Sequence, residues 1–296
     1  MTLADGAAIE PARSAFPGTT PAVPVAVADG TDIPTSFARA SIEPDPSRPG
    51  GRMLYLNDIE CSYVDLTDPT HLEFGYVKRF ADAIETFFDP TQPLRATHIG
   101  GGGVTLPRYL SATRRSVRQI VYEIDEKLIE LVREQLGLRT GPELRVKIGD
   151  ARLRMDRRST WSADLIVGDA FFGRMVPPHL ASMQFARVVR RVLRPGGLYV
   201  LNVIDAPPLA FARSQAATLL ATFGDVALAT DPEVLRSKSS GNVVFVASDS
   251  DLPIAALRRR AAIGRTPDRV LDRNDVLAFA GSARPLPDPV PGGASA

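Results

Sequence analysis

The chain has 296 residues, of which 44% are hydrophobic, and a mean hydropathy of −0.02. We expect a soluble globular protein with one sizeable core, in which about 200 residues form a single α/β domain. The formal net charge of +1 argues against a nucleic-acid-binding protein. The single cysteine, Cys61, excludes an internal disulfide and a cysteine-rich metal site, and the histidines lack ligand spacing. No stretch approaches the ~18 apolar residues that span a membrane, and the pattern of a secretory signal is missing, so we expect a cytoplasmic location.

Both ends of the chain lack the pattern of packed elements. Residues 1–50 are rich in Ala, Pro, Gly, Thr and Asp without apolar periodicity, so they cannot bury enough surface to offset the entropy of ordering. We expect a disordered tail there. After residue 250 we expect a basic helix over residues 254–263 and then a loose, Pro/Gly-rich end. The main domain would occupy residues 76–250, with a small region at 51–75 before it.

Four consecutive glycines at residues 100–103 are the most informative feature of the chain. An apolar strand is expected before them, at 94–99, and a helix after them, at 106–112. Glycine lets the backbone turn sharply off a strand and approach a ligand closely. This setting predicts a nucleoside-binding loop, with a flexible surface turn as the alternative. A nicotinamide fingerprint fits less well, because Leu106 stands where a third glycine or alanine would be required.

The next strand, expected at 119–124, carries Glu123 near its end and is followed by Asp125. An acid at the tip of this strand accepts hydrogen bonds from ribose hydroxyls. Asp125 is a candidate N-cap for a helix over residues 126–137, which has an apolar stripe at helical spacing. The glycine loop and the acid therefore predict a β-α-β-α unit that binds a nucleoside.

Two further strands end in acids. A strand at 144–148 is followed by Asp150, which would either accept a hydrogen bond from an adenine amino group or cap the next helix. A strand at 164–169 is nearly all apolar and ends in Asp169. Because ligands bind beyond the carboxyl ends of strands in open α/β sheets, we expect Asp169 to face the substrate.

The remaining pattern completes a sheet. We expect helices at 178–193 and 208–223, and strands at 198–203, 226–229 and 242–247. The count predicts a seven-stranded, mostly parallel sheet with helices on both faces. This arrangement resembles the α/β, Rossmann-like fold of S-adenosylmethionine-dependent methyltransferases, which we therefore expect.

Residues 54–248 resemble the spermidine synthase family of aminopropyltransferases. Besides the glycine run and its acids, the resemblance rests on Leu54-Tyr55-Leu56-Asn57-Asp58, on the stretch from Leu72 to Tyr76, and on Pro177-Pro178-His179-Leu180. It implies a small β-hairpin region at 51–75 ahead of the methyltransferase-like domain. It also implies a donor site in which Gly100, Gly101 and Gly102 line the nucleoside, Glu123 holds the ribose, and Asp150 with Ala151 holds the adenine.

The resemblance further implies a chemistry, the transfer of an aminopropyl group from decarboxylated S-adenosylmethionine to an amine. The amine attacks the carbon next to a sulfonium, so it must lose a proton and be held in line with the leaving sulfur. Asp169 would be the catalytic residue, and Tyr76 and Phe172 would line the substrate site. The implied partners are a small-molecule amine and a second copy of the chain, as a homodimer. No metal is implied.

Among the departures from the family pattern, two replace acids that would contact the substrates. Gly103 stands where the family has an aspartate beside the aminopropyl portion of the donor, and Phe172 stands where it has a second acid for the amine. Three functions therefore stay open. They are an aminopropyltransferase with an altered acceptor, a methyltransferase that uses S-adenosylmethionine itself, and a nucleoside-binding protein that has lost catalysis.

Overall fold

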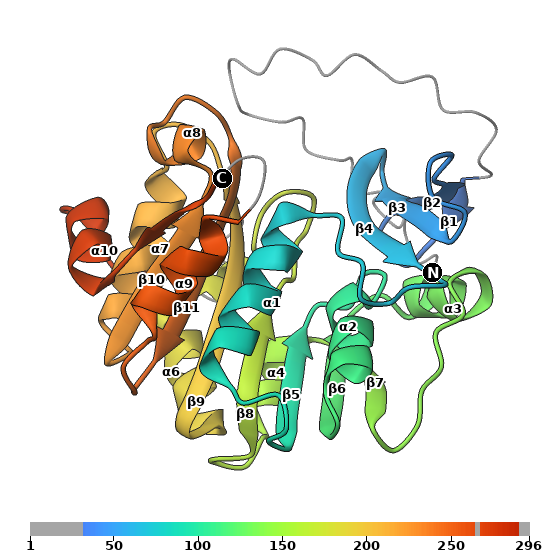
Figure 1. Ribbon diagram of the computed structural model, residues 1–296, viewed down its shortest axis with the longest axis horizontal. Coiled ribbons are helices and arrows are strands. Elements are labelled where there is room, and N and C mark those ends of the chain that lie inside the picture. Colours follow the sequence, from blue (N-terminus) through green and yellow to red (C-terminus); the bar gives the residue numbers. More distant parts are fainter. Residues whose placement is uncertain (1–31, 264–266, 290–296) are drawn as a thin grey trace, which may run out of the picture. The chain divides into compact units, whose positions relative to one another are not determined.

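The computed structural model describes residues 32–263 and 267–289. Within these ranges the strands form a four-stranded antiparallel sheet, ordered β1-β2-β3-β4, and an eight-stranded mixed sheet, ordered β12-β10-β11-β9-β8-β5-β6-β7 (Figure 1). The predicted α/β class and methyltransferase-type architecture are confirmed, although the main sheet has one strand more than expected.

The small sheet consists of β1 (Ile33–Pro34), β2 (Arg39–Pro44), β3 (Gly51–Leu56) and β4 (Ile59–Asp65). β3 and β4 form the expected hairpin, whose turn residues Asn57 and Asp58 both have positive φ, at 49° and 63°. Asn and Asp tolerate this left-handed conformation better than most residues.

The expectation of a disordered tail up to residue 50 is wrong for residues 33–50. β2 pairs with β3 over five residue pairs, and Ala40 is completely buried. The backbone of β2 is satisfied by the next strand along the chain, β3, and this pairing does not depend on an apolar alternation within β2 itself. Residues 1–31 of the expected tail lie outside the described residues.

The main sheet has a parallel half and an antiparallel half. Its strands are β5 (Leu94–Ile99), β6 (Val117–Glu123), β7 (Leu144–Ile148), β8 (Ala163–Gly168), β9 (Leu193–Asp205), β10 (Asp225–Thr230), β11 (Gly241–Ser248) and β12 (Arg269–Leu271). β5 to β9 pair in parallel, whereas β11, β10 and β12 add antiparallel strands beside β9. The carboxyl ends of β5, β6, β7 and β8 therefore meet at one edge, where the predicted acids lie.

Helices cover both faces of this sheet. They are α1 (Gly75–Phe87), α2 (Thr105–Thr113), α3 (Glu126–Gln135), α4 (Ala151–Asp156), α5 (Pro178–Ala181), α6 (Met183–Val192), α7 (Ala210–Leu220), α8 (Pro232–Leu235), α9 (Ile254–Ala261) and α10 (Arg273–Ala280). One core joins Phe80 of α1 and Leu110 of α2 to Leu165 of β8, and a second, on the other face, joins Phe185 of α6 to Ile166. α3 packs instead in a third cluster with β6 and the small sheet.

Two further expectations need correction. The helix expected at 178–193 is broken at Ser182, whose extended backbone (φ −73°, ψ 158°) ends α5 and whose side chain caps α6. The basic helix near 254–263 is present as α9, but the expected loose end is wrong for residues 269–280, which form β12 and α10. The apolar side chains of Val276 and Phe279 anchor α10 in the core.

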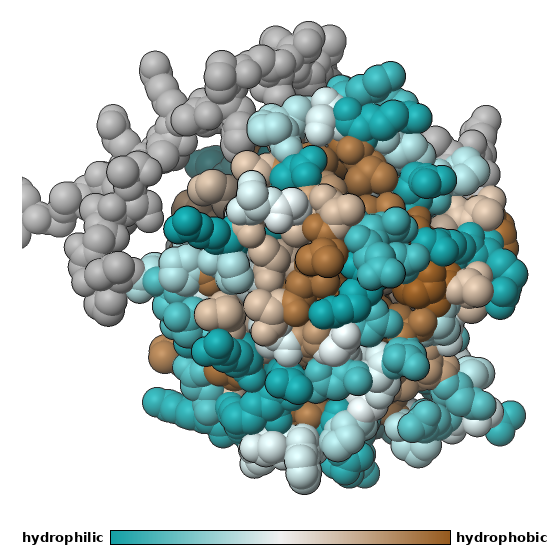
Figure 2. Space-filling model, turned by 90° about the vertical axis from the view of Figure 1, so that its left-hand side faces the viewer, coloured by the Kyte–Doolittle hydropathy of each residue, from teal (hydrophilic) through white to brown (hydrophobic). Residues whose placement is uncertain are grey.

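The face on the α10 side mixes hydrophobic and hydrophilic residues (Figure 2). Leu277 of α10 is 61% exposed. In the part of the chain that the structure describes, no helix combines the length and the apolar character needed to cross a membrane.

Candidate active site

The glycine loop after β5 lies directly against the end of β8. Gly100 has φ +92°, and a β-carbon there would lie 2.2 Å from the carbonyl oxygen of Asp169. Only glycine fits such an approach. The expectation was close approach to a ligand, but at Gly100 the neighbour is the backbone of the catalytic candidate itself. This contact fixes the position of Asp169 relative to the loop.

The same loop also contacts the small sheet. The amide of Gly103 donates a hydrogen bond to Ser62 Oγ on β4 (2.9 Å). A β-carbon at Gly102, where φ is +47°, would lie 2.6 Å from Ser62 Oγ, and one at Gly103 would lie 2.9 Å from Val64 Cγ2. The space that a side chain at position 103 would need is thus filled by two β4 side chains.

Glu123, the predicted ribose acid, already has a structural role, because its carboxylate accepts hydrogen bonds from three backbone amides. Its Oε2 accepts the amide of Gly101 (2.7 Å), and its Oε1 accepts the amides of Ile124 (2.7 Å) and Asp125 (3.0 Å). Three bonds leave capacity for a further donor, because an ionised carboxylate has about four acceptor positions. A ribose contact at Glu123 stays a prediction, added to an observed structural role.

Asp150 has both of its oxygens engaged. Oδ1 accepts the amide of Leu153 (2.9 Å) and so caps α4, which was the alternative reading of this residue. Oδ2 pairs with His179 Nε2 on α5 (2.9 Å). Ala151 is 7% exposed and packs in the core of the main sheet, so among the described contacts its role is packing.

Asp169 is half-buried beyond the end of β8. Its Oδ1 accepts a hydrogen bond from Asn202 Nδ2 of β9 (3.0 Å), and Tyr76 of α1 also hydrogen-bonds to it. Desolvation raises the pKa of Asp169 to about 6, against the lowering effect of these two bonds. Burial, followed by the nearby charge of Asp169, raises the pKa of Tyr76 well above its usual value, so the phenol stays a donor. A carboxyl with a pKa near neutrality suits proton transfer.

Asp169 and Tyr76 open into one pocket of about 480 Å³, counting space open to solvent. Its lining comes from β4, the start of α1, the glycine loop and the start of α2: Ser62, Tyr63, Glu73, Phe74, Tyr76, Val77, His98, Gly100, Gly101, Thr105, Leu106, Pro107, Val167 and Asp169. The pocket therefore combines apolar side chains with a carboxyl whose pKa is raised.

Phe172 does not line this pocket. It is 67% exposed at a tight turn in which its backbone pairs with Met175, and Gly173 at φ +60° makes the turn. A substrate contact through Phe172 stays a prediction that would require the turn to fold over the pocket.

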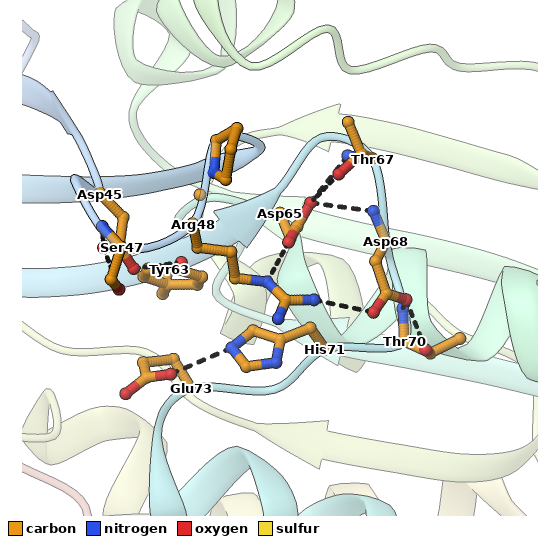
Figure 3. A network of polar contacts seen from close by, with 12 residues as sticks. Asp45, Ser47, Arg48, Tyr63, Asp65, Thr67, Asp68, Thr70, His71 and Glu73 are labelled. Carbon is orange, nitrogen blue, oxygen red and sulfur yellow. Dashed lines mark hydrogen bonds and ion pairs between the residues drawn. The ribbon is translucent and has the colours of Figure 1, made fainter.

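The pocket wall is braced by a polar network on the small sheet (Figure 3). Arg48 pairs with Asp65 at the end of β4 and with Asp68 (2.9 Å) in the segment that leads to α1. His71 Nε2 pairs with Glu73 Oε2 at 3.0 Å, and its ring meets Tyr63 edge-on at 5.6 Å. Glu73 and Tyr63, both pocket residues, are thereby held in position.

Sequence reasoning missed three partners of these groups: Asn202 on Asp169, Ser62 on the glycine loop, and His179 on Asp150. Asn202 could have been found, since it is the one amide within an apolar strand expected at 198–203. His98 sits in β5 as expected and pairs with Gln119 Oε1 (2.9 Å), and burial lowers its pKa to about 4. No group of His, Cys, Asp and Glu among the described residues is arranged to hold a metal ion.

Comparison with known proteins bears on the identity of this site. No family model matches the chain. The polyamine aminopropyltransferase of Vibrio vulnificus (strain CMCP6) is 27% identical over 195 residues, which are 65% of this chain and 62% of that relative. The match thus spans less than two thirds of the curated relative.

Solved structures agree with this relationship. The crystal structure of a probable spermidine synthase from Corynebacterium glutamicum ATCC 13032 superposes with a TM-score of 0.82 and 29% identity, covering 89% of this chain and 98% of that one. Human methyltransferase-like protein 13, with a TM-score of 0.54 and 18% identity over 72% of this chain and 95% of its own, shares the fold. The chain is a distant relative of the spermidine synthases, or polyamine aminopropyltransferases.

Proposed function

We propose that this protein transfers an aminopropyl group from decarboxylated S-adenosylmethionine to an amine. The observation that carries the proposal is Asp169, a half-buried acid at the end of β8 with its pKa raised to about 6, which faces a pocket together with Tyr76. The relationship to aminopropyltransferases supports the same reaction.

Asp169 would act on the amine. The nitrogen attacks the carbon next to the sulfonium, the carbon–sulfur bond breaks, and its electron pair goes to sulfur, which leaves as the neutral thioether methylthioadenosine. The proton lost by the amine goes to the Asp169 carboxylate. Tyr76 and Asn202 hold this carboxylate in place for the proton transfer.

The donor would lie across the strand ends beside the pocket. The ribose would use the remaining acceptor capacity of Glu123, and the adenine amino group would lie near Asp150. Gly100 and Gly101 line the pocket next to Asp169, which is where the sulfonium must lie for attack.

The test is calorimetric titration with decarboxylated S-adenosylmethionine, S-adenosylmethionine and methylthioadenosine, with NAD as a negative control. Tighter binding of the decarboxylated donor, followed by amine-dependent release of methylthioadenosine, is the expected result. If none of the amines in a broad screen causes release of methylthioadenosine, transfer to an amine is contradicted.

A methyltransferase is the second candidate, and one observation favours it. Ser62 and Val64 occupy the space of an acid at position 103, so nothing at this position selects a decarboxylated donor. Preferential binding of intact S-adenosylmethionine would support this candidate over the first.

A further inference from the structure

The adenine end of the proposed donor site is tied to a segment far away in sequence. Asp150 Oδ2 pairs with His179 Nε2 at 2.9 Å, and Asp150 Oδ1 caps α4. Each oxygen still has one acceptor position free, so Asp150 can receive an adenine amino group without giving up either partner. The amide at the start of α4 and the imidazole of His179 fix the orientation of the Asp150 carboxylate.

Arg152 connects this pair to the rest of the protein. Its Nη1 donates to the carbonyl oxygen of His179 (3.0 Å), so it holds the backbone that carries the imidazole. The same guanidinium makes a two-pronged pair with Asp288, in which both N···O distances are 3.0 Å. Such paired bonds fix orientation as well as distance. The Arg152 side chain is only 18% exposed, which limits screening by solvent.

The segment of residues 286–288 crosses the helices on this face. Its Asp288 carboxylate also accepts the Ser182 hydroxyl, at the break between α5 and α6. Leu286 accepts the amide of Met183 (2.7 Å) and donates its own amide to Thr218 Oγ1 of α7 (2.9 Å). The hydrogen bond from Arg152 lowers the pKa of Asp288, which keeps the carboxylate ionised near neutral pH.

We propose that Asp288 and Arg152 are positioning residues for the nucleoside site, which orient Asp150 through His179 so that it recognises the amino group of adenine. The proposal rests on the proposed nucleoside site but adds residues 286–288, which no reasoning about strand ends would include. The carboxy-terminal segment then contributes to base selectivity without touching the ligand.

The experiment compares methylthioadenosine with methylthioinosine, whose base carries a carbonyl in place of the amino group. The full chain with Asp288→Asn should bind methylthioadenosine about tenfold more weakly while its affinity for methylthioinosine changes little. Asp249→Asn is the matched control, because it breaks another arginine pair, Arg190–Asp249 at 2.7 Å, far from α4 in sequence. The Asp249→Asn variant should prefer methylthioadenosine over methylthioinosine as strongly as the wild type does.

A double-mutant cycle separates positioning from general loosening. If Asp288 acts through Asp150, then Asp288→Asn should cost little further affinity in a chain that already carries Asp150→Asn. Additive losses, or equal losses for both nucleosides, would refute the proposal. If Asp288→Asn fails to fold, Arg152→Lys, which keeps the charge but loses the two-pronged geometry, takes its place with the same expected loss of discrimination.

The two proposals fail differently. A wild-type protein that binds neither nucleoside overturns the proposed function and this inference together. A wild-type protein that prefers methylthioadenosine, with an Asp288→Asn variant of equal preference, leaves the proposed function standing and overturns the inference alone.

Discussion

Asp65 and Asp169 are two acids at the ends of strands, and their surroundings shift their pKa values in opposite directions. Burial raises the pKa of Asp65, but bonds from the Thr67 hydroxyl, Arg48 and two backbone amides outweigh it and hold this pKa well below its usual value. Asp169 receives two neutral hydrogen bonds and no cation, and desolvation raises its pKa to about 6.

The difference lies in whether charge is compensated. Asp65, which is 4% exposed, is bound on all sides and fixes the segment between β4 and α1. Asp169 keeps part of its acceptor capacity for a ligand and faces a pocket. A fully paired carboxylate serves structure, and an under-paired one is available for chemistry.

The largest expected effect comes from removing the under-paired acid. Asp169→Asn should lower amine-dependent release of methylthioadenosine about 10³-fold, because a general base typically contributes 10²- to 10⁴-fold. Stability should not fall, since the change removes a poorly solvated charge. Turnover assays and thermal melting of the same preparations measure both. Undiminished turnover would remove Asp169 from the mechanism.

Replacing the paired acid, Asp65, should reduce stability. Asp65→Asn should lower the free energy of unfolding by about 2–3 kcal/mol, because it leaves Arg48 without its buried partner. This value includes a reduction for Arg48, whose side chain is 35% exposed. Urea denaturation measures the change, and Asp32→Asn, which breaks the exposed Arg39–Asp32 pair, is the control with little expected loss. If Asp65→Asn and Asp32→Asn lower the free energy of unfolding equally, then burial of Asp65 does not make its ion pair the more stabilising one.

The pH dependence of stability should have opposite signs at the two acids. The pKa of Asp65 is lower in the folded state, so its contribution is full above the unfolded value of about 3.9 and is lost as the pH falls through the folded value. The pKa of Asp169 is raised to about 6, so folding binds its proton and stability falls as the pH rises from about 4 to 6.

Subtracting the urea-derived stability of each Asn variant from that of the wild type, at each pH, isolates these two slopes. For Asp169 the fall should be on the order of 2 kcal/mol. A flat difference curve between pH 4 and 6 would contradict the raised pKa.

The smallest expected effect concerns the one amide that steadies Asp169. Its hydrogen bond lowers the pKa of Asp169, so Asn202→Ala should move the acid limb of the kcat/KM profile to higher pH. Asn242→Ala, which removes the donor to Asn202 Oδ1 (3.0 Å) without touching Asp169, should shift it less. A shift to lower pH in the first variant would show that Asn202 does not stabilise the charged form.

The local apolar pattern was sufficient to predict a strand where that strand's own residues carry the signal. The apolar runs at 94–99 and 144–148 match β5 and β7, and the expected loop and strand-end acids occur in their expected order. β12 was missed because it is completed by pairing with β10, which is distant in sequence. β2 was missed because its own residues lack an apolar alternation, although its partner β3 is the next strand along the chain. The break at Ser182 was missed because the apolar residues that predict the helix, from Phe185 to Val192, all follow it and do not mark where the helix begins.

Within the site, strand-end position predicted that Asp169 faces a pocket but could not identify the partners of each acid. His179 and Asp150 are 29 residues apart, and their pairing depends on how α5 packs beside α4. Phe172 was placed by its position in the family string, yet its side chain is exposed at the Gly173 turn and does not line the pocket.

The contact of Ser62 and Val64 with Gly103 has a consequence for protein engineering. A designer who restores the family's aspartate with Gly103→Asp alone would place its β-carbon 2.9 Å from both Ser62 Cβ and Val64 Cγ2, so the hairpin or the loop would have to move. Smaller residues at both β4 positions are a prerequisite for that change. The route to a family-like donor loop therefore begins on the small sheet, with changes at positions 62 and 64 made before the change at position 103.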